Sequence, residues 1–122
     1  IYHLTSTSIY DMILLDHKEG DDSMEKKKEV RIYIAGDCVD SLNHNILTIN
    51  GITGSTIETN NGYWLDDNGN VIEEDSYCIV VIVDENLVNK VLSKIPLVVY
   101  DQDCVLVTIA DVDTILLKLN KR

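Results

Sequence analysis

One apolar run beside an acidic turn constrains the fold of this chain more than any other feature. Residues 77–83 carry no charged side chain and are mostly β-branched. A strand that is apolar on both faces is typical of the middle of a sheet. Residues 66–69 read Asp-Asp-Asn-Gly, and Asn-Gly accepts the positive φ angles of a tight turn. Residues 62–83 are therefore predicted to form a β-hairpin whose second strand is central.

Two helices and two further strands are predicted around this hairpin. Residues 29–36 have the β-branched composition of a strand. Apolar side chains recur at three- and four-residue steps from Val39 to Ile49 and from Leu87 to Ile95, which is the spacing of an amphipathic helix. The predicted order is strand, helix, strand, strand, helix, strand, over residues 29–36, 39–49, 55–65, 70–83, 84–95 and 104–109.

Local signals add detail to these elements. Asp37 or Asp40 is predicted to cap the first helix and Asp84 the second, because a carboxylate accepts hydrogen bonds from free N–H groups at a helix start. Pro96 is expected to interrupt the second helix, since proline removes a backbone donor. Residues 60–62, Asn-Asn-Gly, predict a bulge before the hairpin turn.

The element order is that of a split βαβ, or ferredoxin-like, α+β fold (βαββαβ), with an antiparallel sheet and two helices on one face. Its first and third strands are central and its second and fourth lie at the edges. The two strands that are apolar on both faces, residues 32–35 and 77–83, are the first and third. Because edge strands present unpaired backbone groups, we expect pairing between subunits and hence a homo-oligomer.

The start and end of the chain are predicted to lie outside this pattern. Residues 1–23 form an N-terminal extension, either a short helix over residues 8–18 or a strand over 9–15, and Met24 then opens a charged leader. Residues 24–122 form the ferredoxin-like domain. Its apolar tail, residues 114–119, is expected to be a fifth strand or a docking turn.

Charge placement indicates the kind of partner. The chain has a net charge of -11, and residues 32–89 contain ten carboxylates but no Lys or Arg. Such a span repels phosphate backbones, so direct nucleic-acid binding is not expected. It attracts a basic protein surface and speeds the encounter. A basic protein partner is therefore predicted, and a merely solubilising acidic surface is the alternative.

Other features bound the compartment and the cofactors. The three cysteines are odd in number and form no Cys-x-x-Cys pair, which indicates free thiols in a reducing, cytoplasmic environment. No apolar run approaches the roughly 20 residues of a membrane helix, and no signal peptide is visible. The chain lacks phosphate-binding glycine loops, and its histidines lack metal-ligand spacing. No membrane association, metal or cofactor is predicted.

Several short motifs resemble a widespread class of small bacterial and phage proteins. These motifs are a Gly-x-Trp at Gly62 and Trp64, a Glu-x-Ser at Glu74 and Ser76, and a late Gln-x-Cys-Val-Leu that starts at Gln102. The class resembles the nitrogen-regulatory PII-like superfamily and implies a ferredoxin-like fold and a mobile-element origin, with no settled activity. The long nucleotide-binding loop and basic phosphate ligands of true PII proteins are missing here.

The hairpin is also the predicted binding surface. Strand alternation places Glu74 and Ser76 on one face and Glu73 and Asp75 on the other. Tyr63 and Trp64 face opposite sides, so that one joins the core and the other is an exposed anchor. The predicted partner-binding residues are Trp64, Asp66, Asp67, Glu73, Glu74, Asp75 and Ser76.

These observations favour a non-enzymatic acidic binding module from a phage or mobile element. In its sharpest form it blocks a nucleic-acid-binding protein by mimicking phosphate charge, as an anti-CRISPR inhibitor does. The alternative is a PII-like oligomeric sensor of a small ligand or metabolite. An enzyme with carboxylate chemistry is a third reading, which requires two buried carboxylates facing one pocket.

Overall fold

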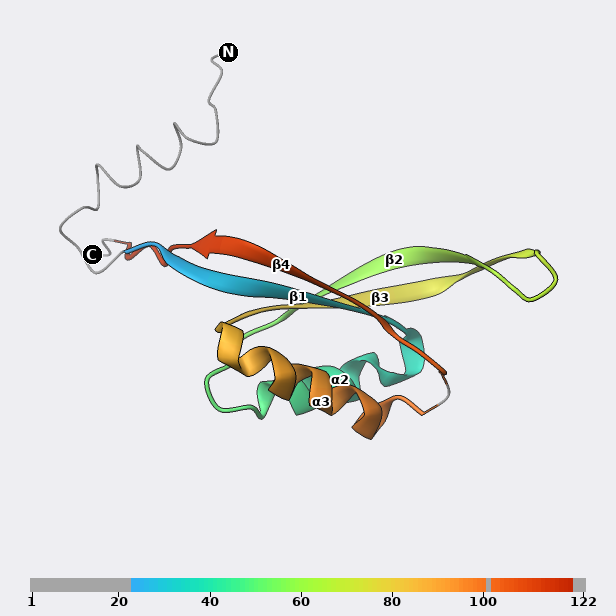
Figure 1. Cartoon of the computed structure of the whole chain (residues 1–122), viewed down its shortest axis with the longest axis horizontal. Coiled ribbons are helices and arrows are strands. Elements are labelled where there is room, and N and C mark those ends of the chain that lie inside the picture. Colours follow the sequence, from blue (N-terminus) through green and yellow to red (C-terminus); the bar gives the residue numbers. More distant parts are fainter. Residues whose placement is uncertain (1–22, 101, 120–122) are drawn as a thin grey trace, which may run out of the picture. The chain divides into compact units, whose positions relative to one another are not determined.

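The computed structural model describes residues 23–100 and 102–119. The chain divides into two compact units, one of residues Lys27–Val112 and one that combines Ile1–Lys26 with Asp113–Arg122. The larger unit contains the body of the sheet and both α-helices (Figure 1). The predicted extension over residues 1–23 lies almost wholly outside the described residues, so it stays a prediction.

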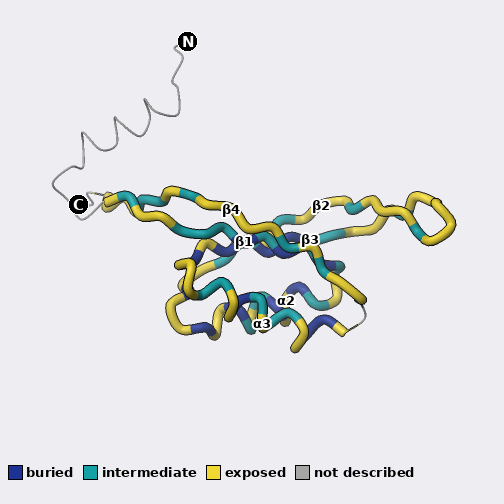
Figure 2. Tube along the Cα trace, in the orientation of Figure 1, coloured by how far each residue is buried: buried dark blue, intermediate teal, exposed yellow. Residues whose placement is uncertain are grey.

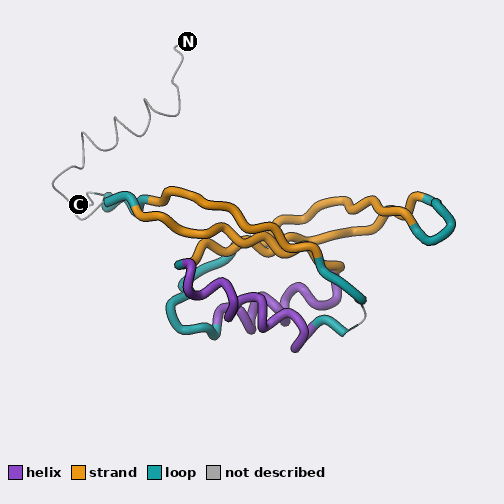
Figure 3. The backbone as a smooth tube through the Cα atoms, viewed as in Figure 1, coloured by secondary structure: helices purple, strands orange, loops and turns teal. Residues whose placement is uncertain are grey.

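The larger unit has the predicted ferredoxin-like topology. Its four-stranded antiparallel sheet has the order β2-β3-β1-β4, so the first and third strands are central, as predicted. Both α-helices cover one face of the sheet (Figure 3). Along the chain the elements are β1 (Glu25–Ala35), the 3-10 turn η1 (Gly36–Cys38), α2 (Val39–Leu47), β2 (Thr56–Leu65), β3 (Val71–Val83), the 3-10 turn η2 (Glu85–Leu87), α3 (Val88–Val98) and β4 (Leu106–Thr114).

The core lies between the sheet and the two helices (Figure 2). Side chains alternate along a strand, and in β1 the buried set is Val30, Ile32 and Ile34. Leu42 and Ile46 of α2 are fully buried against this layer. Ile79, Val81 and Val83 of β3, with Val91 of α3, complete the central part of the core.

The opposite face of the sheet has no helix over it in the described part of the chain. Arg31, Tyr33 and Ala35 of β1 point to this side and are half-buried, and Ile82 of β3 is exposed. Helices cover only the apolar side of each central strand, and the other side includes polar residues such as Arg31 and Ser76. We call the uncovered side the open face; it carries the candidate site.

The hairpin of β2 and β3 is more regular than predicted, and its strands begin and end within one residue of the predicted bounds. The two strands pair in a single register from Thr56↔Val80 to Leu65↔Val71, so the predicted bulge at residues 60–62 is wrong. The turn has a positive φ at Gly69 alone, as in a three-residue hairpin loop that ends on a left-handed glycine. The end of the hairpin extends past the helices (Figure 1), and consequently Tyr63 and Trp64 are both exposed, at 64% and 49%. The prediction that one of them joins the core is wrong.

Strand β1 begins earlier than predicted. It starts at Glu25, and the supposed charged leader is part of the strand. Lys27 forms an ion pair with Asp84 and Lys28 with Asp111, so the lysines have carboxylate partners on neighbouring segments. These pairs explain how a basic run enters a sheet.

The last strand begins and ends later than predicted. β4 covers Leu106–Thr114 in place of residues 104–109. The tail at residues 115–119 forms neither helix nor strand, which overturns the fifth-strand prediction for that segment. Cys104 precedes β4 and is exposed.

Both helices begin through a 3-10 turn in place of a side-chain cap. Neither α2 nor α3 has a capping hydrogen bond from a side chain, and Asp84 binds Lys27. Pro96 lies inside α3, which continues to Val98. The backbone N–H of Val99 donates to the carbonyl of Ile95 at 2.9 Å, so the helical turn closes after the proline.

Candidate functional site

A concavity of about 680 Å³ lies on the open face. Its walls come from three adjacent strands, β2, β3 and β1, with Leu106 of β4 at one side. A volume of this size is ordinary for a small-molecule site, for which roughly 300–1,000 Å³ is typical. The lining residues used below are Arg31, Tyr33, Glu58, Asn60, Gly62, Trp64, Glu74 and Ser76.

Strand register explains why these residues meet. Gly62 lies opposite Glu74, and Asn60 lies opposite Ser76, which in turn pairs with Ala35 on β1. Directly opposed positions share a face of the sheet. Alternate residues in part of each strand, over 31–35, 58–64 and 74–76, therefore line the same concavity. These three segments are separate in the sequence.

Gly62 allows the side chain of Ser76 to lie close to the backbone of β2. A Cβ atom at this position would lie 3.1 Å from Cβ of Ser76, closer than nearly all contacts of that kind. The φ angle of Gly62 is not in the left-handed region, so the backbone conformation does not require glycine there. Between Asn60 and Trp64 the lining therefore consists of backbone alone, and an added side chain would crowd Ser76.

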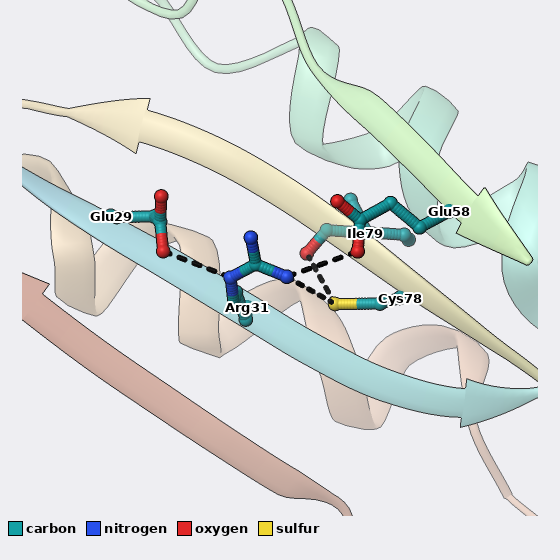
Figure 4. Close-up of polar contacts among 5 residues, drawn as sticks. All are labelled: Glu29, Arg31, Glu58, Cys78 and Ile79. Carbon is teal, nitrogen blue, oxygen red and sulfur yellow. Dashed lines mark hydrogen bonds and ion pairs between the residues drawn. The ribbon is translucent and has the colours of Figure 1, made fainter. Parts of the chain in front are cut away.

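Arg31 forms a tightly paired ionic cluster at the edge of the concavity (Figure 4). Its Nε donates to Glu29 Oε1 at 2.9 Å, and its Nη1 donates to Glu58 Oε1 at 3.0 Å. The bond from Glu29, and then that from Glu58, raise the pKa of the guanidinium above its ordinary value. Among the described residues, Arg31 is the one cation in the lining, and two carboxylates already share it.

Cys78 lies beneath this cluster on β3. Its side chain is fully buried, and burial raises the pKa of its thiol, although the nearby Arg31 acts in the opposite direction. Nη1 of Arg31 lies 4.0 Å from its Sγ. A buried thiol of raised pKa is mostly protonated at neutral pH, which matches a structural role and not a nucleophilic one.

Three of the predicted site residues, Trp64, Glu74 and Ser76, line the concavity. The alternation of the acidic residues is as predicted, since Glu73 lies opposite Tyr63, on the other face of the hairpin. The hydroxyl of Tyr63 donates to Glu73 Oε2 at 3.1 Å. The carboxylate of Glu74, in contrast, has no hydrogen bond or ion pair to another described residue.

Asp66 and Asp67 belong to the hairpin turn and not to the concavity. Asp66 Oδ1 accepts the backbone N–H groups of Asn68, at 2.9 Å, and Asn70, at 2.8 Å. These bonds, that from Asn70 first, lower the pKa of the Asp66 carboxyl. Asp75 is exposed and points to the face opposite Glu74.

Nine of the lining residues were not among the predicted binding residues: Arg31, Tyr33, Ala35, Glu58, Asn60, Asn61, Gly62, Tyr63 and Leu106. Arg31 and Glu58 are 27 residues apart and meet because β3 lies between their strands. Period-two alternation in β1 and β2 places these residues on one face of each strand. Only the strand register shows that the two positions lie close together.

The structure offers no metal centre among the residues it describes: no cluster of three or more His, Cys, Asp or Glu side chains could hold an ion. No helix in the described segments is long and apolar enough to span a membrane.

No protein-family model matches the sequence, and no curated protein matches it. Similar folds are found among solved structures. The GlnK-ATP complex of B. subtilis superposes with a TM-score of 0.61 at 16% identity, over 71% of this chain and 82% of GlnK.

Two further structures have comparable similarity. CPII of Thiomonas intermedia K12, a nitrogen regulatory PII-like protein bound to ADP, AMP and bicarbonate, has a TM-score of 0.57 at 20% identity, over 75% of this chain and 96% of CPII. The periplasmic divalent cation tolerance protein CutA of Archaeoglobus fulgidus has a TM-score of 0.60 at 7% identity, over 70% of this chain and 82% of CutA. The TM-scores show a shared fold. Because the sequence identities are this low, the similarity is to the architecture of these proteins alone.

Proposed function

We propose that this protein is a non-enzymatic sensor of a small ligand, which binds in the concavity on the open face. The observation that carries the proposal is the meeting of Gly62, Trp64, Glu74 and Ser76 in one space of about 680 Å³. These residues come from two of the three short motifs on which the sequence resemblance rests. An aromatic ring, a free carboxylate and a hydroxyl within one concavity are the elements of a specific small-molecule site.

The chemistry of the lining favours binding over catalysis. The concavity is lined by no His or Cys among the described residues, and its two carboxylates differ in role because Glu58 is paired with Arg31. Glu74 is exposed, so no pair of buried carboxylates is available to separate an acid from a base.

The structural neighbours support the sensor over the other functions considered. GlnK was solved with ATP, and CPII, a nitrogen regulatory protein, with ADP, AMP and bicarbonate. None of the neighbours described above is a phage inhibitor, and none supports a mobile-element origin. The basic protein partner predicted from the acidic span, with Asp66, Asp67, Glu73 and Asp75 in the interface, stays a prediction.

A ligand screen tests this function with a variant that adds a side chain to the lining of the concavity. The wild-type chain and Gly62→Val are screened by thermal shift against nucleotides, amino acids, amines and bicarbonate. A true ligand at about 100 times its dissociation constant stabilises the folded state by roughly 2.7 kcal/mol. We expect at least one compound to raise the melting temperature of the wild type but not of the variant.

Leu47→Val, on α2 and away from the concavity, is the control for general effects of substitution. It should respond to the ligand like the wild type. If every stabilising compound acts equally on Gly62→Val and the wild type, the concavity is not the ligand site and the proposal fails.

A further inference from the structure

The charge of the concavity defines the class of ligand that it accepts. Its lining contains one cationic side chain, Arg31, and two carboxylates, Glu58 and Glu74. Arg31 also binds Glu29, which lies just outside the lining. A bound anion would therefore meet an excess of negative charge, with the single guanidinium already neutralised.

Phosphate groups fit this site poorly. Phosphate recognition relies on Lys, Arg or a helix N-terminus that presents free N–H groups. The lining is made of strand residues, and residues 32–89 contain no Lys or Arg. The nucleotides bound by the structural neighbours therefore do not match the charge of this concavity.

An organic cation meets complementary groups at the open end of the concavity. Trp64 lies opposite Ile72, two residues from Glu74 on the same face of β3, so Trp64 and Glu74 are diagonal neighbours. Diagonal positions are roughly 7–8 Å apart, a distance that an aromatic and a long side chain can bridge. A cation between them would contact the π face of Trp64 and the carboxylate of Glu74.

Two further features separate Glu74 from the other acidic residues of the hairpin. Glu73 accepts a hydrogen bond from Tyr63, and Asp66 accepts two from the turn backbone. The carboxylate of Glu74 has no such bond within the described residues, and Gly62, which carries no side chain, lies directly opposite it. The free carboxylate, the glycine and the aromatic ring lie at neighbouring positions of one face.

Resting on the proposed function, we propose that the ligand is a small organic cation, such as a quaternary or primary alkylammonium compound, held between the ring of Trp64 and the carboxylate of Glu74. Ser76 and Asn60 provide hydrogen-bonding groups for its polar end.

The test uses choline as the probe and the fluorescence of Trp64 as the readout. Trp64 is the only tryptophan of the chain, so its emission reports on this site without labelling. The matched neutral probe is 3,3-dimethyl-1-butanol, in which a tert-butyl group replaces the trimethylammonium group. We expect choline to produce a saturable change in emission and the neutral probe to bind at least about tenfold more weakly, because cation–π and ionic contacts together contribute more than about 1.4 kcal/mol.

Two charge variants separate a local contact from a general field. Glu74→Gln removes the carboxylate inside the site, and Asp67→Asn removes the same charge from the turn outside it. Choline affinity should fall at least about tenfold in the first, as for loss of a charged contact, and by less than about twofold in the second. Equal losses in both variants, or equal binding of the two probes, would overturn the cation proposal.

The results also distinguish this inference from the proposed function. If ATP or another anion binds and Gly62→Val abolishes its binding, the sensor function stands and the cation class is wrong. If choline changes the emission of wild type and Gly62→Val alike, its contact lies outside the concavity and the cation proposal fails. The sensor function fails only if every stabilising compound acts equally on the two chains.

Discussion

Asp66 organises the hairpin turn through a single carboxylate. It accepts two backbone N–H groups of its own loop, and a hydrogen bond to a charged acceptor is stronger than one to a neutral acceptor. The bonds from Asn70 and then Asn68 lower the pKa of this carboxyl below its ordinary value of 3.8. The ionised form is therefore favoured in the folded state.

The sign of the resulting pH dependence follows directly. Because the folded state binds this proton less tightly than the unfolded state, Asp66 contributes stability above its ordinary pKa. That contribution disappears as the pH falls through the lowered pKa of the folded state. The affected window thus lies below about pH 4.

We predict that Asp66→Asn flattens the acid limb of the stability profile. Urea unfolding of wild type and variant would be compared at steps from about pH 6 to pH 2. The variant should be less stable than the wild type at pH 6, and the difference should shrink below about pH 4. Parallel profiles over the whole range would show that the carboxylate charge does not stabilise the turn.

The four motif residues show what the sequence could and could not predict about the site. Period-two alternation was sufficient to separate Glu74 and Ser76 from Glu73 and Asp75, and the structure agrees. Arg31 and Glu58 could not be paired in advance, since their contact depends on β3 lying between β1 and β2 in one particular register. The concavity itself depends on the alignment of three strands, which motif residues alone do not predict.

At the scale of elements, the order and the central strands were predictable because each strand and helix has its own hydrophobic period. Ends were less so. The basic run at residues 26–28 looked like a leader, yet its ion pairs with Asp113, Asp84 and Asp111 place it in β1. These partners lie far along the chain, so local composition could not identify them.

The β2–β3 hairpin and α2 differ sharply in how they are held. Leu42 of α2 is fully buried against the sheet, whereas Leu65 near the hairpin turn is 65% exposed. Truncating a buried leucine removes its transfer free energy and leaves a cavity. Truncating an exposed leucine does neither.

We predict unequal costs for the same substitution in the two elements. Leu42→Ala should lower the free energy of unfolding by about 2–5 kcal/mol. Leu65→Ala should change it by no more than about 0.5 kcal/mol. Both would be measured by urea unfolding at low protein concentration. A loss of similar size for Leu65→Ala would mean that the hairpin end is covered in solution.

At the scale of the whole molecule, the open face and the hairpin end expose much apolar surface. Trp64, Leu65, Val71, Ile82 and Leu106 are each at least 49% exposed. β2 also forms an edge of the sheet with one side unpaired. Large exposed apolar patches and free strand edges indicate surfaces that associate. We therefore propose that the chain forms a homo-oligomer.

Sedimentation equilibrium tests this proposal against the 13.7 kDa mass of one chain. The informative variant is the double substitution Leu65→Lys with Val71→Glu, because these positions face each other across the hairpin. Opposite charges at paired positions keep the cross-strand contact while removing the apolar surface. The wild type should sediment as a species larger than one chain, and the variant should shift toward the monomer with little change in its far-ultraviolet circular dichroism. A wild type that remains monomeric at roughly 100 µM, a concentration at which interfaces of micromolar affinity are populated, would show that these surfaces do not associate.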